Sequence, residues 1–175
     1  MTLYRMISYN ESYVRESKIN GEAIENEKYR KKDEDLVKIV QPLVDWYREN
    51  KRDLPWRHNP DAYRVWISEI MLQQTRVEAV KGYYDRFLKA LPTVKDLAEA
   101  EEDKLLKLWE GLGYYNRVRN MQKAAQQIMV DHEGIFPDTY EEILQLKGIG
   151  NYTAGAISAF AYGIPSRQWM VTYSG

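Results

Sequence analysis

The sequence predicts an all-α fold, and three observations support that prediction. Apolar residues recur at helical spacing along most of the chain, and no segment shows a convincing strand pattern. Thr93–Asp96 and Thr139–Glu142 have the spacing of capping boxes, which open helices. At 175 residues, with 44% hydrophobic residues and five tryptophans, the chain is long and apolar enough for one packed domain.

The sequence of the first half predicts three helices, which follow a charged N-terminal segment. Residues 1–33 are charged and lack apolar periodicity, so we expect a flexible extension there. A helix over 34–50 follows, which Pro42 either begins or kinks. Asn59 is the expected N-cap and Pro60 the first-turn proline of the next helix, whose apolar stripe predicts burial. The third helix is expected over 77–90.

The second half predicts shorter helices separated by glycines. Thr93 opens a short one, and another is expected over 101–110, ending at Gly111 or Gly113. A helix over 116–132 is closed by Gly134, and Thr139 opens the one that leads into a glycine turn. The helix after that turn is expected to end near 162–163.

The segment LKGIGNYTAGA at 146–156 contains the most informative turn. Gly148 and Gly150 lie between two helical segments, and glycine permits positive φ and close backbone approach. The first N–H groups of the following helix lack intrahelical partners, so the turn can bind an anion such as a nucleic-acid phosphate. A tight turn between two packed helices is an equally good interpretation of these residues alone.

These residues resemble the helix-hairpin-helix of the DNA glycosylase superfamily that includes endonuclease III. SEIMLQQTRV at 68–77, LPWR at 54–57 and GLGYY at 111–115 specifically resemble the MutY-type adenine glycosylases, in that family's order. The resemblance runs from about 35 to 165. It implies a glycosylase domain over 34–165, with the hairpin at about 140–162. That domain would be most of the six-helix domain, with the iron–sulfur half of the fold incomplete.

The resemblance implies an N-glycosyl hydrolase of base excision repair that acts on double-stranded DNA with adenine opposite 8-oxoguanine or guanine. Such an enzyme flips the nucleotide out, protonates the base and stabilises a cationic sugar with a carboxylate. Glu69 occupies the position of the family's acid. Its apolar neighbours, residues 65–71, predict a raised pKa through desolvation. The alternative places Glu69 on the solvent face with Gln73 and Arg76.

Tyr152 distinguishes two branches of the superfamily. Bifunctional relatives such as endonuclease III have a lysine two residues after the second glycine, and it forms a Schiff base with the sugar. This chain has a tyrosine there, which implies a monofunctional enzyme in which the phenol supports the catalytic aspartate. A structural tyrosine packed against the hairpin is the alternative. Lys147 precedes the first glycine and is not the lyase lysine.

The resemblance also implies a DNA-binding set. Gln74 and Thr75 would lie beside the oxidised guanine, and Tyr114 would be a stacking wedge, although Tyr114 and Tyr115 also fit ordinary core aromatics. The remaining members are expected at the base pocket, the wedge and the hairpin: Trp56, Arg57, Leu112, Lys147, Gly148 and Gly150. Arg117 and Arg119 fit either phosphate contacts or a solvated helix face.

Composition limits cofactors, partners and location. The chain has no cysteine, which excludes disulfides and the family's four-cysteine [4Fe–4S] cluster, and its two histidines lack metal spacing. We therefore predict no metal, except that the resemblance implies a monovalent cation at the hairpin. The net charge of −1 is unusual for a free-standing DNA-binding protein. With no signal peptide or apolar span in the sequence, we expect a cytoplasmic monomer without membrane contact.

The tail at 166–175 departs from the family. No Asp or Glu follows Glu142, and Met170 stands where the family's catalytic aspartate belongs. Trp169, Met170 and Val171 require the codons TGG-ATG-GTN, which encode Asp-Gly when the frame is shifted by one base. This predicts a C-terminally truncated, frameshifted member; a short paralogue with a freely evolved tail is the alternative.

Two hypotheses of function follow. The first is the family's adenine glycosylase, with this chain inactive because a thioether cannot replace a carboxylate. The second is a non-catalytic remnant or weak helix-hairpin-helix DNA-binding module.

Overall fold

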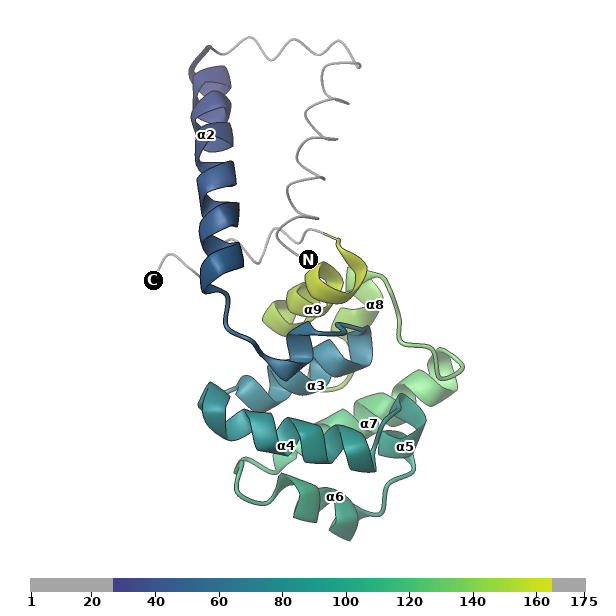
Figure 1. Ribbon diagram of the computed structural model, residues 1–175. Helices are drawn as coiled ribbons and strands as arrows, with labels where there is room; N and C mark the ends of the chain where they lie inside the picture. The colour runs from purple at the N-terminus through teal and green to yellow at the C-terminus, as the bar shows by residue number, and fades with distance from the viewer. Residues whose placement is uncertain (1–26, 165–175) are drawn as a thin grey trace. The chain divides into compact units, whose positions relative to one another are not determined.

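The structure is a computed structural model that describes residues 27–164. The predictions for residues 1–26 and for the tail, including Met170, lie outside these residues. The chain divides into two units, one on each side of the bond between Asp53 and Leu54. Within residues 27–164 every regular element is an α-, 3₁₀- or π-helix and none is a strand (Figure 1), which confirms the all-α prediction.

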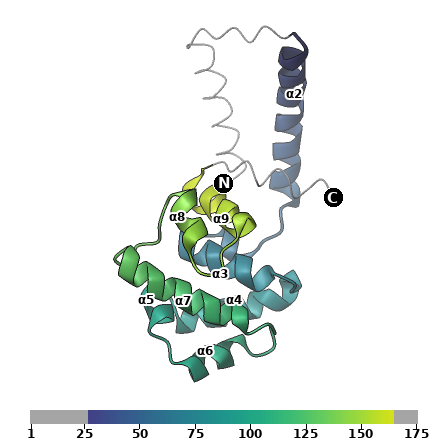
Figure 2. The same cartoon turned by 180° about the vertical axis from the view of Figure 1, so that it is seen from behind.

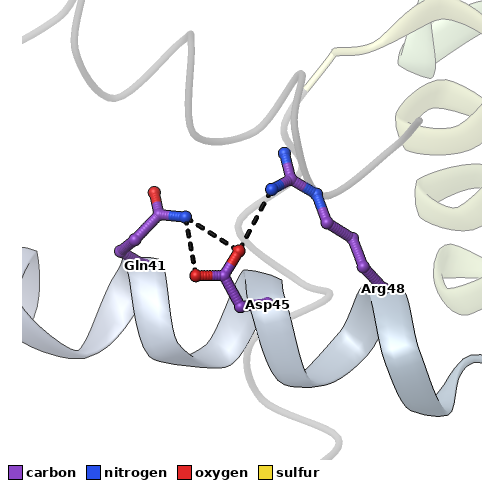
Figure 3. Close-up of polar contacts among 3 residues, drawn as sticks. All are labelled: Gln41, Asp45 and Arg48. Carbon is purple, nitrogen blue, oxygen red and sulfur yellow. Dashed lines mark hydrogen bonds and ion pairs between the residues drawn. The ribbon is translucent and has the colours of Figure 1, made fainter.

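The first unit contributes helix α2, Glu27–Asn50. It begins at Glu27 rather than at residue 34, because a run of Glu, Lys and Arg has high helix propensity even without apolar periodicity. Pro42 lies inside the helix and does not begin it. A set of polar side chains spans Pro42: the Gln41 amide and the Arg48 guanidinium donate to the Asp45 carboxylate at 2.9 and 3.1 Å (Figure 3). Such pairs one turn apart stabilise a helix modestly.

The second unit holds the core and all the candidate site residues described below. Its helix α3 contacts α4 and α9 and also the short elements η1 and η2, while α5 packs on α7 and α4 contacts α6 (Figures 1 and 2). The element bounds are η1 Pro55–Arg57, α3 Ala62–Leu72, α4 Val77–Ala90, α5 Val94–Ala98, α6 Glu102–Trp109, α7 Asn116–Asp131, α8 Tyr140–Gln145, α9 Asn151–Ile157 and the π-helical η2 Ser158–Tyr162.

The helix caps follow the sequence in part. Thr93 and Asp96 form a complete capping box at α5. At α8 the Thr139 hydroxyl accepts from the Glu142 N–H, but the Glu142 carboxylate accepts from the Thr139 hydroxyl and not from its N–H, so the predicted box is only half formed. The N-cap of α3, however, is Asp61 and not Asn59. The Asp61 carboxylate accepts from the Arg64 N–H at 2.8 Å, which satisfies a first-turn donor that Asn59 does not reach. Pro60 therefore precedes the cap and is not the first helical residue.

Buried aromatic rings fix α3 and α6 in place. Trp66 of α3 is fully buried and makes edge-to-face contacts with Phe136 at 5.5 Å and Tyr63 at 6.3 Å between ring centroids. Trp109, at the end of α6, is also fully buried and meets Phe87 of α4 at 6.0 Å. Aromatic pairs of this geometry add to the free energy of burial, so the middle of α3 and the end of α6 are firmly placed.

Neither a bilayer-spanning helix nor a cluster of metal-ligating side chains is found between residues 27 and 164.

Candidate functional site

Glu69 and Tyr152 meet where α3 packs on α9. Glu69 is partly buried, and this burial raises the pKa of its carboxyl to about 7, while a hydrogen bond with the Tyr152 hydroxyl lowers that pKa by a smaller amount. The expected desolvation of Glu69 is confirmed. The solvent-face alternative is wrong, because Gln73 and Arg76 are exposed and Glu69 is not. A carboxyl with a pKa near neutrality can donate a proton to a leaving group.

The segment after α3 and the segment before α7 each present a side chain in an unusual backbone conformation. Gln74 has φ 60° and Tyr114 has φ 48°, both in the left-handed region that non-glycine residues rarely occupy. Tyr114 is 69% exposed, so it is not a core aromatic. An open hollow separates the two segments, and its lining residues are Gln73, Gln74, Tyr114, Tyr115, Asn116 and Arg117.

Arg117 joins these two segments. Its Nη1 donates to the carbonyl oxygens of Ile70 and Gln73 at 2.8 and 2.6 Å. Its Nη2 donates to the carbonyl oxygens of Leu112 and Gly113 at 2.9 and 3.2 Å. The sequence suggested a phosphate contact or a solvated face for Arg117, and the structure instead gives it four carbonyl partners. No signal in the sequence could reveal this, because the partners at Ile70 and Gln73 are remote in the chain.

The glycine turn between α8 and α9 rests on α7. Gly148 has φ 79°, and a Cβ at this position would lie 2.8 Å from Asn120 Cβ, so only glycine fits without displacement. The Gln127 side chain accepts from the Lys147 N–H at 3.3 Å and donates to the Gln145 carbonyl at 3.4 Å. Gly150 is the N-cap of α9, with extended backbone and open space where a Cβ would be added.

The comparisons with known proteins agree with this arrangement. Residues 67–164 match the family described as HhH-GPD superfamily base excision DNA repair protein. The chain belongs to the HhH-GPD superfamily. This family region contains Glu69, the hairpin turn, and the segments 73–76 and 112–115 around the exposed side chains of Gln74 and Tyr114 (the raised segments).

Relatives of this HhH-GPD protein are adenine DNA glycosylases. The chain is 50% identical over 118 residues to the Buchnera aphidicola (subsp. Acyrthosiphon pisum) enzyme, covering 67% of this chain and 34% of the relative. It is 45% identical over 130 residues to the human enzyme, covering 69% of this chain and 24% of the relative. The chain thus spans about a third or less of the length of these two relatives.

Solved HhH-GPD structures share the fold. A thermostable thymine-DNA glycosylase superposes with a TM-score of 0.66 and 30% identity, covering 71% of this chain and 58% of that one. A non-covalent endonuclease III–DNA complex superposes with a TM-score of 0.61 and 21% identity over 74% and 61% of the two chains, which shows the fold alone. Because this chain has no cysteine, its own residues do not fit a thiolate-bound iron–sulfur cluster.

The remaining predicted site residues of the HhH-GPD chain lie in different environments. Trp56 is buried, with its ring edge-to-face against Tyr84 at 5.5 Å, whereas its neighbour Arg57 is exposed. Leu112 is buried, and its carbonyl is one of the four acceptors of Arg117. Thr75 is partly exposed, and its hydroxyl donates to the Gln73 carbonyl at 3.4 Å. The DNA contacts expected of these residues stay predictions.

We expect Gly148→Ala to destabilise the HhH-GPD chain by about 1–3 kcal/mol. Alanine is strained in a left-handed backbone conformation, and its Cβ would clash with Asn120. The matched control is Gly150→Ala, which has φ −102° and no atom within 4 Å of the added Cβ. We expect it to change the free energy of unfolding by less than about 0.5 kcal/mol. Urea denaturation of both variants tests this, and equal losses at the two glycines would contradict it.

Proposed function

We propose that the protein is a monofunctional adenine DNA glycosylase of base excision repair. Its substrate would be double-stranded DNA with adenine opposite 8-oxoguanine or guanine, bound by a cytoplasmic monomer. The observation that supports this most strongly is Glu69, a partly buried carboxyl with a pKa of about 7 next to Tyr152. The identity of the chain to adenine DNA glycosylases over this region supports the choice of base.

In the proposed reaction, protonated Glu69 donates its proton to a ring nitrogen of the flipped adenine. The N-glycosidic bond then breaks, its electron pair leaves with the base, and the cationic sugar captures water, whose proton passes to the Glu69 carboxylate or to solvent. At neutral pH a pKa of about 7 keeps a large fraction of Glu69 protonated before the reaction. Tyr152 lacks an amine for Schiff-base chemistry, so the product is an abasic site with an intact strand.

The same proposal assigns the exposed segments to DNA. Tyr114 would stack against a base as the duplex opens, and Gln74 with Thr75 would lie beside the opposite base. The N-terminal end of α9, preceded by Gly148 and Gly150, would meet a phosphate, with a monovalent cation at the carbonyls of the turn. Lys147 and Arg57 are exposed and lie where added positive charge would favour the DNA backbone.

A second candidate function concerns the 175-residue chain itself. It has no Asp or Glu after Glu142, and its net charge is −1. We therefore propose that this chain binds DNA without releasing adenine, as a weak helix-hairpin-helix module. Its dissociation constant would lie in the non-specific range of about 10⁻⁴–10⁻⁶ M at physiological salt and would rise with salt concentration.

Adenine release from two forms of the protein tests both proposals. One form is the 175-residue chain. The other is expressed from a gene in which one nucleotide is added or deleted near codons 166–168, so that the shifted reading frame encodes Asp-Gly in place of the present tail. Each is incubated with an A:8-oxoguanine duplex and with a T:A control duplex, and abasic sites are cleaved with alkali. We expect product only from the frame-shifted form on the mismatched duplex. Product from the 175-residue chain would contradict the weak-module proposal, and none from an Asp-containing form would contradict the glycosylase proposal.

A further inference from the structure

The four carbonyl acceptors of Arg117 include those of Gln73 and Gly113, the residues immediately before Gln74 and Tyr114. A carbonyl shares its peptide plane with the next residue's nitrogen, so fixing that plane restricts φ of the next residue. We propose that Arg117 is a positioning residue: it holds Gln74 and Tyr114 in their left-handed backbone conformations, which keep both side chains exposed for contact with DNA. The proposal rests on the proposed function, which gives these two side chains their role at the mismatch.

The backbone of both raised residues needs such a restraint. Left-handed conformations at Gln74 and Tyr114 are unfavourable for non-glycine residues and persist only where the surroundings enforce them. The Arg117 guanidinium lies at the C-terminal end of α3, where the last carbonyls lack helical partners and a positive charge is favourable. One planar guanidinium therefore supplies hydrogen-bond donors to carbonyl oxygens at the end of α3 and in the segment before α7.

The Tyr114 ring also lies against the same guanidinium. Arg117 Cζ lies 5.7 Å from the centroid of the Tyr114 ring and 5.4 Å from that of buried Trp109. Trp109 Nε1 donates in turn to the Gly113 carbonyl at 3.0 Å. The guanidinium thus connects an exposed ring to the core, and this contact pre-orders Tyr114 before any base stacks on it.

The hydrogen bonds of Arg117 distinguish it from an arginine that binds phosphate. Both of its terminal nitrogens donate to carbonyls, and its Nε is buried without a hydrogen-bond partner among the described residues. Lysine cannot reproduce the arrangement, because a single ammonium lacks the planar fork that reaches two segments. Arg119 provides a matched control. It lies on the same helix, is exposed, and pairs with Glu102 at 2.9 Å.

Hydrogen exchange of the free 175-residue chain is the first test. We expect Arg117→Lys to speed amide exchange at 73–76 and 112–115 while exchange in α8 and α9 is unchanged, and Arg119→Lys to change neither segment. Unchanged exchange at both segments in Arg117→Lys would overturn the proposal. A second measurement uses urea denaturation to compare the loss of stability caused by Arg117→Lys in the wild-type and Gln74→Gly backgrounds, because glycine adopts positive φ without strain. The loss of stability should be smaller there than in the wild-type background, and an equal loss would overturn the proposal.

DNA binding by the same chain is the second test. The probe is a short duplex with a central A:8-oxoguanine pair and 2-aminopurine beside it, whose fluorescence rises when its base unstacks. We expect Arg117→Lys and Tyr114→Ala to lose this rise to a similar degree, and the double variant to lose no more than Tyr114→Ala. The slope of log affinity against log salt should stay unchanged in Arg117→Lys, whereas loss of a phosphate contact lowers it by about one.

Additive losses in the double variant, or a lower salt slope, would overturn the positioning role. If the wild-type chain gives no fluorescence rise at saturating protein, the proposed stacking role of Tyr114 fails, whereas the glycosylase proposal is decided by adenine release from the Asp-containing form. The exchange experiment then decides by itself whether Arg117 fixes the two raised segments.

Discussion

Glu69→Gln is expected to lower the single-turnover rate of adenine release by about 10²–10⁴-fold in the Asp-containing form of the protein. Glutamine keeps the size and hydrogen-bonding capacity of the side chain but cannot donate a proton to the base. Binding to the A:8-oxoguanine duplex should stay within about twofold of wild type, because only the chemical step loses an interaction.

The matched control for this loss is Glu78→Gln, which removes the same charge from an exposed carboxyl in the first turn of α4. We expect normal rates from it. Rapid-quench assays with excess enzyme measure both variants. A near-normal rate for Glu69→Gln would exclude Glu69 as the acid.

Glu69→Gln should also change the pH dependence of folding stability in the 175-residue chain. The pKa of Glu69 is about 7 in the folded state against an ordinary value of 4.5, so folding favours the protonated form. The free energy of unfolding of the wild type should therefore fall as pH rises from about 4.5 to about 7. At about 1.36 kcal/mol per pKa unit, reduced because the carboxyl is only partly buried, we expect a loss of roughly 1–2 kcal/mol. The glutamine variant should lack this loss, and parallel pH profiles from urea denaturation would contradict the assignment.

Trp109→Ala is expected to destabilise the chain by about 3–5 kcal/mol, the second large effect. The Trp109 ring is fully buried against Phe87, and its Nε1 donates to the Gly113 carbonyl. Trp109→Phe keeps most of the packing and loses only the donor and some volume, so we expect about 1–2 kcal/mol from it.

Thermal and urea unfolding measure the Trp109 series, with Ile135→Ala as the control at a 72% exposed apolar residue. That control should change stability by less than about 0.5 kcal/mol. If Trp109→Ala were no more destabilising than Ile135→Ala, the packing described for the end of α6 would be wrong.

Local patterns in the sequence predicted much of the fold and part of the site. The helix expected over 77–90 is α4 with the same bounds, and Thr93 caps α5 as expected, because these signals lie within one turn of the residues they affect. Glu69 was recognisable as desolvated because its immediate neighbours are apolar. Asp61 shows the limit of such patterns, since Asn59 and Asp61 both suit an N-cap and only the folded backbone shows which of them reaches a first-turn N–H.

What the sequence could not predict depends on contacts between remote segments. Arg117 lies more than 40 positions from its partners Ile70 and Gln73, and no periodicity connects them. The contact of Gly148 with Asn120 is similar, since the glycine signals a turn but not the helix behind it. The early start of α2 has a different cause: residues 27–33, about two turns, lack apolar periodicity, and their high helix propensity alone accounts for the helix there.

The spacing of Arg117 and Asn120 on α7 has a consequence for how such a protein evolves. Residues three apart lie on the same helical face, and here one member supports the raised segments and the other supports the hairpin turn. Inserting or deleting one residue between them would rotate one support by about 100° around the helix axis. Natural length variation should therefore be absent from residues 117–120.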